Sequence, residues 1–133
     1  MPGAYTHTET VAYSNTNGQI QSVKNAIQGD AEYNLTTTLA ANTAAQEIDI
    51  AFARAQLRSL CVTTTGPVTI ATNSGAAPGD TKVLVAGQTL IWNTKHPEAV
   101  PFTADVTKLF LTTGPVPATV TMAVLTNLSP QDN

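Results

Sequence analysis

Charged residues and aromatic rings are scarce in this chain of 133 residues. Lys, Arg, Asp and Glu make up 11% of it, well under the roughly one quarter that is typical of soluble domains. Aromatic residues make up 5%, and the six basic residues are scattered in a chain of net charge −3. Nucleic-acid binding needs a clustered positive field over the phosphates, so we expect no nucleic-acid partner.

Cysteine and long apolar runs are nearly absent as well. The single cysteine, Cys61, excludes an internal disulfide, and within Leu60-Cys61-Val62 it is expected to pack as a small buried hydrophobe. No apolar run approaches the roughly 20 residues that cross a bilayer, so no membrane partner is expected. The first residues lack the basic start and apolar centre of a secretory signal, and we therefore expect folding in a reducing cytoplasm.

Residues that carry catalysis or bind metals do not converge in the sequence. The two histidines, His7 and His96, have no partners in a pattern of ligand spacing, and the loop that holds His96 and Glu98 is of a kind that is usually solvated. Glu47 and Asp49 alternate with isoleucines, which places both carboxylates on a solvent-facing side of a strand. No nucleophile motif, phosphate loop or dinucleotide fingerprint occurs. We expect a protein without catalytic residues, metal or cofactor, and not an enzyme.

What the chain does contain is threonine, valine and leucine, alternating in short runs that Gly and Pro interrupt. In the C-terminal third, Val106–Thr113 and Thr119–Leu125 alternate with a period of two across a Gly/Pro-rich turn, which predicts an antiparallel pair. A second pair is expected around Gly87, between Thr81–Ala86 and Gln88–Asn93. Four more strands are expected at Ala31–Leu39, Glu47–Phe52, Leu57–Thr64 and Val68–Thr72.

About eight short strands at this spacing predict an all-β fold, an antiparallel β-sandwich of jelly-roll-like form. We expect an extended N-terminal arm at 1–18, the sandwich at 19–127 and a C-terminal tail at 128–133. The arm is expected to hold at most one short strand, at Glu9–Tyr13. The segment Gln19–Gln28 fits a short strand or a helical turn equally well.

The expected arm has too little apolar surface to offset the entropy of ordering it, about 1–2 kcal/mol per residue. We therefore expect it to become ordered only against another surface, with Tyr5, Val11 and Tyr13 as its contact residues.

Two further aromatic residues are candidates for subunit interfaces. Phe110 lies in Leu109-Phe110-Leu111, where apolar side chains point to both sides of a strand, and Trp92 is expected in the core or at an interface. A strand that is apolar on both sides needs a cover on its second face, so we expect a homo-oligomer, either a dimer or a trimer.

The order of several phrases in the sequence resembles a known family. These phrases are Asp49–Phe52 with Leu57–Leu60, Val68–Ser74, Pro78–Asp80 with Val83–Trp92, and Pro101–Thr112. They look like the small cement, or decoration, proteins of tailed-bacteriophage capsids, a group in which jelly-roll-like sandwiches occur. The likeness covers roughly Ala31–Leu125 and lies in strand texture rather than in a catalytic motif.

The resemblance implies a non-enzymatic virion protein, made in the host cytoplasm and bound to the outside of the capsid. There it would stabilise the shell by bridging subunits of the major capsid protein, with its arm ordered on the lattice. The alternative is a receptor- or glycan-binding β-sandwich module of a phage tail or fibre, which should present a solvent-facing aromatic platform. A hydrolytic enzyme is a third hypothesis, but the sequence holds no assembled catalytic constellation for it.

Overall fold

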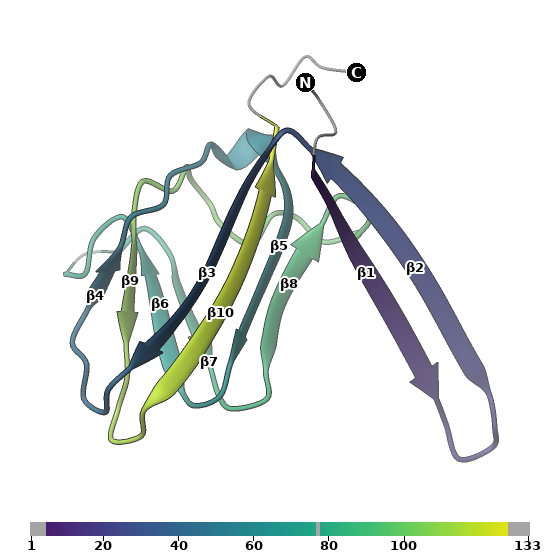
Figure 1. The fold of residues 1–133 in the computed structure, drawn as a ribbon, viewed down its shortest axis with the longest axis horizontal. Coiled ribbons are helices and arrows are strands. Elements are labelled where there is room, and N and C mark those ends of the chain that lie inside the picture. Colours follow the sequence, from purple (N-terminus) through teal and green to yellow (C-terminus); the bar gives the residue numbers. More distant parts are fainter. Residues whose placement is uncertain (1–4, 77, 128–133) are drawn as a thin grey trace.

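A computed structural model describes residues 5–76 and 78–127, so the expected tail at 128–133 lies outside the described residues. Within the described part the protein is all-β, with ten strands and one short 3₁₀ helix. Two four-stranded antiparallel sheets pack face to face as a sandwich, and a two-stranded sheet projects from it (Figure 1). The all-β class and the antiparallel sandwich expected from the sequence are therefore confirmed.

The projecting sheet is a long hairpin of β1 (Tyr5–Ser14) and β2 (Ile20–Gly29), paired over ten residues each. Its turn is stabilised by Asn15, whose side-chain oxygen accepts hydrogen bonds from the backbone N–H groups of Asn17 and Gln19, both at 3.0 Å. Gly18 in the same turn has φ +83°, a left-handed conformation that glycine adopts without steric cost.

This hairpin differs from the extended arm that the sequence led us to expect. Residues 5–14 form a full strand rather than a short one, and within the segment Gln19–Gln28 the chain is strand from Ile20 onward, as part of β2, rather than a helical turn. The boundary expected after residue 18 therefore falls inside the turn of the hairpin. Polar composition was the misleading signal, because threonine and tyrosine favour strands even where the strand is exposed on both sides.

The first sheet of the sandwich has the order β3-β10-β5-β8, with β3 at Ala31–Leu39, β10 at Ala118–Thr126, β5 at Leu57–Thr64 and β8 at Thr89–Asn93. The second sheet has the order β4-β9-β6-β7, with β4 at Gln46–Ile48, β9 at Leu109–Thr112, β6 at Val68–Thr72 and β7 at Thr81–Leu84. The 3₁₀ helix η1 (Arg54–Gln56) leads into β5.

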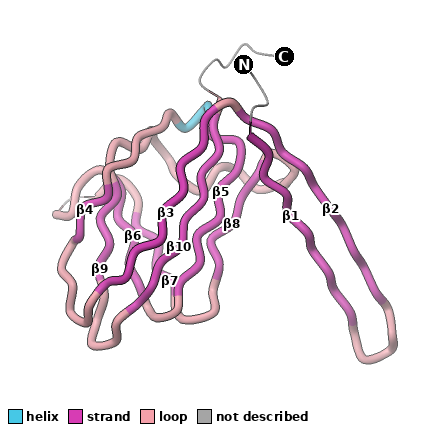
Figure 2. The backbone as a smooth tube through the Cα atoms, in the orientation of Figure 1, coloured by secondary structure: helices cyan, strands magenta, loops and turns pink. Residues whose placement is uncertain are grey.

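Two expected pairings are wrong, because consecutive strands mostly lie in opposite sheets. β9 pairs with β4 and β6, whereas β10 pairs with β3 and β5, so the two do not form the C-terminal hairpin that their turn suggested. β7 and β8 are separated in the same way. Among the described strands of the sandwich, β6 and β7 alone are both consecutive and paired. The loops between the other successive strands therefore cross from one sheet to the other at the ends of the sandwich (Figure 2).

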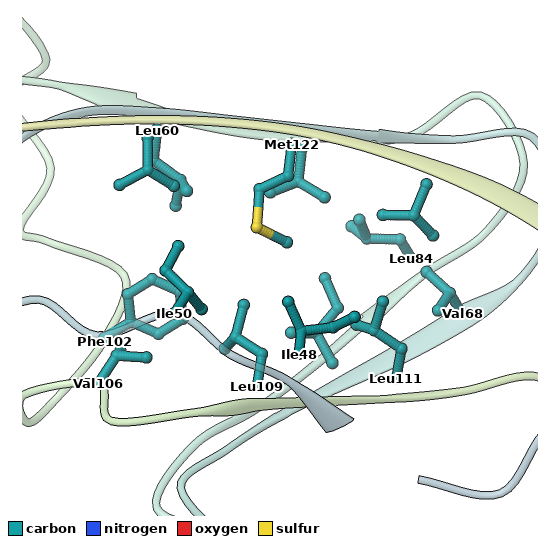
Figure 3. Close-up of a cluster of buried hydrophobic side chains, with 14 of the residues drawn as sticks. Ile48, Ile50, Leu60, Val68, Leu84, Phe102, Val106, Leu109, Leu111 and Met122 are labelled. Atoms are coloured by element: carbon teal, nitrogen blue, oxygen red, sulfur yellow. The ribbon is translucent and has the colours of Figure 1, made fainter. Parts of the chain in front are cut away.

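One apolar core lies between the two sheets (Figure 3). Leu60 and Met122 of the first sheet point toward Leu109 and Leu111 of the second, and each of the four is at most 3% exposed. All members of this cluster, including its partly buried rim, come from the chain between Tyr33 and Val124. The sandwich thus has a core of its own, at roughly 1.5–3 kcal/mol for each large apolar side chain buried, and the hairpin is not part of it.

Candidate interaction site

The register of the hairpin gives it two different faces. Side chains of directly opposed residues point to the same side of an antiparallel pair, and successive residues alternate between sides. One face, here named the inner face, therefore carries Tyr5, His7, Glu9, Val11 and Tyr13 of β1 with Gln21, Val23, Asn25, Ile27 and Gly29 of β2. The other, the outer face, carries Thr6, Thr8, Thr10, Ala12 and Ser14 with Ile20, Ser22, Lys24, Ala26 and Gln28.

His7 fastens the inner face to the first sheet. Its Nδ1 lies 3.2 Å from Oγ of Ser59 on β5, and its Nε2 lies 2.8 Å from a carboxylate oxygen of Glu32 on β3. The imidazole ring of His7, which belongs to β1 of the hairpin, therefore contacts two strands of the sandwich, β3 and β5. The sequence placed His7 in a loose arm, and only the fold brings its partners together.

Glu9 makes the second attachment, to the end of β8 and the loop that follows. Nδ2 of Asn93 donates to its carboxylate at 2.7 Å, and Nε2 of His96 lies 2.9 and 3.0 Å from its two oxygens. Burial alone would raise the pKa of Glu9, but the hydrogen bonds from Asn93 and His96, the charge of His96 and a hydrogen bond from Asn25 outweigh it. The pKa of this carboxyl is therefore held below its ordinary value.

The hairpin joins the sandwich through a close backbone approach at Gly29. A Cβ placed on this residue would lie 2.7 Å from both Leu125 Cγ and the Thr126 carbonyl oxygen, so only glycine fits. The next residue, Asp30, donates its N–H to the same Thr126 carbonyl at 3.0 Å, and Arg58 Nε donates to the carbonyl of Gln28 at 3.1 Å. These contacts set the direction in which the hairpin leaves the sandwich.

The residues expected as arm contacts all lie on the inner face. Tyr5, Val11 and Tyr13 are exposed, and Val11 lies opposite Val23, which the sequence analysis did not single out. The missed signal was the alternation through residues 5–13 followed by Asn and Gly residues at 15–18, which together are typical of a hairpin. That these side chains contact a partner stays a prediction.

The two aromatic interface candidates differ in exposure. Trp92 is 9% exposed, belongs to the core, and donates its indole N–H to the carbonyl of Glu98 at 2.9 Å. Phe110 is half-buried on β9, directly opposite Glu47 and Ala71 in the second sheet. Its outward position keeps it as an interface candidate, whereas Trp92 already has its partners inside the subunit.

A groove of about 360 Å³ separates the root of the hairpin from the first sheet. Its lining includes Glu9, Ser59, Cys61, Ile91 and Asn93. Burial raises the pKa of the Cys61 thiol, and the negative charge of Glu9 raises it further. The thiol is therefore a poor nucleophile at neutral pH. It is half-buried rather than enclosed in the core, because it lies on the side of β5 that faces the hairpin.

Several charged side chains away from the hairpin lie on the surface or stabilise loops. Glu47 and Asp49 are both exposed, as expected, and a carboxylate oxygen of Glu47 lies 2.8 Å from Lys108 Nζ. Asp80 accepts a hydrogen bond from the backbone N–H of Thr103 at 2.9 Å, which fixes the loop before β7. Among residues 5–76 and 78–127, no three His, Cys, Asp or Glu side chains are grouped so that they could hold a metal ion.

No helix in the described part of the chain is long and apolar enough to cross a membrane. The chain matches no protein-family model, and no curated protein matches it either.

Proposed function

We propose that this protein is a non-enzymatic structural component of a phage virion. It binds the outside of the capsid and stabilises it by bridging subunits of the major capsid protein. The observation that carries the proposal is the hairpin, which projects from a sandwich that has its own core and exposes apolar side chains beyond it (Figure 1). A body that is stable by itself can keep such an extension available for a neighbouring subunit.

The sandwich is proposed to be a jelly roll. In that fold, two Greek keys distribute eight strands over two sheets, and successive strands cross from one sheet to the other. The orders β3-β10-β5-β8 and β4-β9-β6-β7 support the assignment, because all but one of the successive strands change sheet. The resemblance to cement proteins supports it as well, since jelly-roll-like sandwiches occur among them.

A bridging role fits the weak individual contacts that this surface offers. The exposed apolar residues of the hairpin are few, and the charge of the whole chain is only −3. On a closed shell, however, each copy would be held near its neighbours at high effective concentration, so that many modest contacts add up to firm attachment.

The proposal predicts that the gene for a major capsid protein lies beside the gene for this chain, and the test uses phage heads assembled from that capsid protein. Purified protein is added to heads that lack it, and the bound copies are counted after sedimentation. We expect saturable binding and heads that release their DNA at a higher temperature. Replacing Val11 and Tyr13 by serine should lower occupancy, whereas Val83→Ser on β7 should not. Wild-type protein that fails to bind such heads, or binds without raising the release temperature, would overturn the proposal.

The alternative of a glycan-binding fibre module has less support. Such a module should present a platform of aromatic side chains to solvent, and Trp92 is buried with its indole N–H bonded to the carbonyl of Glu98. Among the described residues, the exposed aromatic side chains are Tyr5 and Tyr13, which lie near opposite ends of β1 and do not form one platform.

A further inference from the structure

Strand β3 forms one edge of the first sheet, and this edge is unprotected (Figure 1). It is nine residues long, whereas the other edge strands of the sandwich, β4, β7 and β8, have three, four and five residues. Long edge strands normally carry charges, proline or a bulge, which prevent another strand from pairing with them. From Tyr33 to Leu39 the chain has none of these, and its register with β10 is uninterrupted.

The register shows which backbone groups of β3 point to the free edge. Thr65 donates its backbone N–H to the carbonyl of Thr119 at 3.1 Å, so odd-numbered residues of β10 bond to β5 and even-numbered residues bond to β3. The backbone N–H and C=O groups of Asn34, Thr36 and Thr38 therefore point away from β10. Within residues 5–76 and 78–127, nothing else forms a hydrogen bond with these backbone groups.

A cleft of about 230 Å³ opens beside this edge, between β3 and the segment 49–52. Its apolar lining includes Tyr33, Ile50 and Phe52, and the two aromatic rings are only half-buried. Both rings pack against the core, so the cleft is a part of the core that this chain does not fill. The volume is below the roughly 300–1,000 Å³ of sites for drug-sized ligands, and it suits one large apolar side chain.

The open backbone groups and the cleft together define the chemistry of the occupant. N–H and C=O groups that repeat along a sheet edge are paired by a second extended strand, as in β-strand addition. Successive side chains of an added strand point to opposite sides, so those on the core side would face the cleft. The carboxylate of Asp49 is exposed at the cleft, which favours a basic residue in the added strand.

A second copy of β3 does not meet these requirements. The apolar side chains of β3 are Tyr33, Leu35 and Leu39, and all three pack in or against the core of their own subunit. In a pair of β3 strands, neither strand would have an apolar side chain left to enter the cleft of the other. The occupant must therefore come from a segment whose side chains are not already used in a core.

We propose that the free edge of β3 binds an extended segment of another protein, which adds a fifth strand to the first sheet and places one apolar side chain in the cleft. This surface is separate from the exposed residues of the hairpin. Its use does not depend on attachment to a capsid, so the inference goes beyond the proposed function and can be tested on the purified protein.

The first experiment follows amide hydrogen exchange by NMR in the full chain, with and without synthetic peptides. Four peptides, each as long as β3, alternate threonine with valine, carry a lysine at each end and differ in the central residue. That residue is alanine, isoleucine, leucine or phenylalanine. The amides of Asn34 and Thr36 report on the free edge, and those of Leu35 and Thr37, which are bonded to β10, are the internal reference.

We expect fast exchange at Asn34 and Thr36 in the free protein, because their N–H groups face solvent. A bound peptide should slow them by about tenfold when its concentration is ten times its dissociation constant. The peptides with a large apolar centre should bind about tenfold more tightly than the alanine peptide, which leaves the cleft empty. Asp49→Asn should weaken binding by about two- to fivefold, as expected for the loss of an exposed ion pair.

Proline variants test the edge itself. Thr36→Pro removes an N–H that points to the free edge, a position at which strands tolerate proline. Val83→Pro is the matched control, because the bond from the N–H of Thr72 to the Asp80 carbonyl directs the N–H of Val83 to the free edge of β7. We expect Thr36→Pro to abolish binding and Val83→Pro to leave it unchanged, with circular dichroism establishing that both variants are folded.

Modified peptides test the same hydrogen bonds without changing the protein. Two versions of the tightest peptide are methylated on the backbone nitrogens of one or the other set of alternate residues. Only one set faces β3 in an added strand, so one version should lose binding and the other should keep it. Equal affinity of the two versions would contradict the proposal, whether or not Thr36→Pro folds.

Three further results would overturn the proposal. One is that none of the four peptides slows exchange at Asn34 and Thr36, and another is that a folded Thr36→Pro variant still binds. The third is slow exchange at these amides that depends on protein concentration without any peptide, which would assign the edge to a second copy. Because no phage heads are used, each of these results leaves the proposed function to be judged by its own test.

Discussion

Glu9 and His96 are 87 positions apart in the sequence, yet Nε2 of His96 lies 2.9 Å from a carboxylate oxygen of Glu9. Glu9 belongs to the hairpin, and His96 belongs to the loop that follows β8, the edge strand of the first sheet. Their contact, together with that of His7, fixes the root of the hairpin on the sandwich. It thereby determines where the exposed side chains of Val11, Val23 and Tyr13 are presented.

This attachment should weaken in acid. The hydrogen bonds of Glu9 keep its pKa in the folded protein below the unfolded value of about 4.3. Their contribution to stability is therefore present above about pH 4.3 and is lost as the pH falls through the lower, folded value. We expect faster amide hydrogen exchange in β1 and β2 at pH 3 than at pH 5, after correction for intrinsic rates. Strand β10 serves as the internal reference.

Variants at two carboxylates test the cause of that acid response. Glu9→Gln should speed amide exchange in β1 and β2 already at pH 5. The difference in exchange rate between pH 3 and pH 5 should therefore become smaller. Glu98→Gln is the matched control, because Glu98 also lies near His96, at 3.6 Å, but is largely exposed. An acid response that Glu9→Gln leaves unchanged would show that other groups control the root.

Gly29 should tolerate no side chain. In Gly29→Ala the new Cβ would overlap Leu125 Cγ and the Thr126 carbonyl oxygen, and one of these is backbone. Overpacking of this kind costs about 1–3 kcal/mol. Gly114→Ala is the control, since a Cβ there meets nothing within 4 Å and the backbone is not left-handed. In urea denaturation, the midpoint of Gly29→Ala should be lower than that of Gly114→Ala, and equal midpoints would contradict this prediction.

Replacing Asn73 should lower the free energy of unfolding for two separable reasons. Its φ is +69°, its Nδ2 donates to the carbonyl of Asp105 at 2.9 Å, and its Oδ1 accepts from the N–H of Thr107 at 2.7 Å. Replacement by alanine or by glycine removes these side-chain hydrogen bonds, each worth about 1 kcal/mol. Alanine would in addition have to adopt the left-handed conformation, which costs about 1 kcal/mol more for alanine than for glycine. Unfolding free energies from urea should therefore fall in the order wild type, Asn73→Gly, Asn73→Ala.

Deletion of residues 1–28 should leave the sandwich folded, because the hairpin contributes nothing to its core cluster. The melting temperature should nevertheless fall, since the deletion removes buried Ile27 and uncovers Leu125, which is fully buried. Cys61 should react faster with maleimide, because the deletion takes away both part of its cover and the charge of Glu9. Loss of the strand signal in circular dichroism would mean that the sandwich needs the hairpin to fold.

Much of the local structure follows from the sequence alone. The alternation of Tyr33, Leu35, Thr37 and Leu39 places β3 where the structure has it, at Ala31–Leu39, and β5 and β6 are likewise found at their expected bounds. Alternation works because a strand buried on one side must repeat its apolar residues every second position. For the same reason Glu47 and Asp49 could be assigned to solvent before any fold was known.

Which strands pair with one another could not be predicted from the sequence and is seen only in the tertiary structure. The turn at 113–117 has the composition of a hairpin, yet β9 and β10 lie in opposite sheets. Composition and period are identical for a turn within a sheet and for a loop that passes between sheets, so neither could distinguish them. The same limit hid the attachment of the hairpin, since nothing near His7 or Glu9 in the sequence identifies Ser59, Asn93 or His96 as partners.

The sequence by itself thus determined most strands of the sandwich and which of their sides are apolar, because both depend on residues a few positions apart, whereas it missed the hairpin strands β1 and β2. The tertiary structure alone decided which strands pair and where the hairpin is anchored. It also decided that Val11, Tyr13 and Val23 share one exposed surface. Those features depend on contacts between residues far apart in the chain, and short-range periodicity carries no information about them.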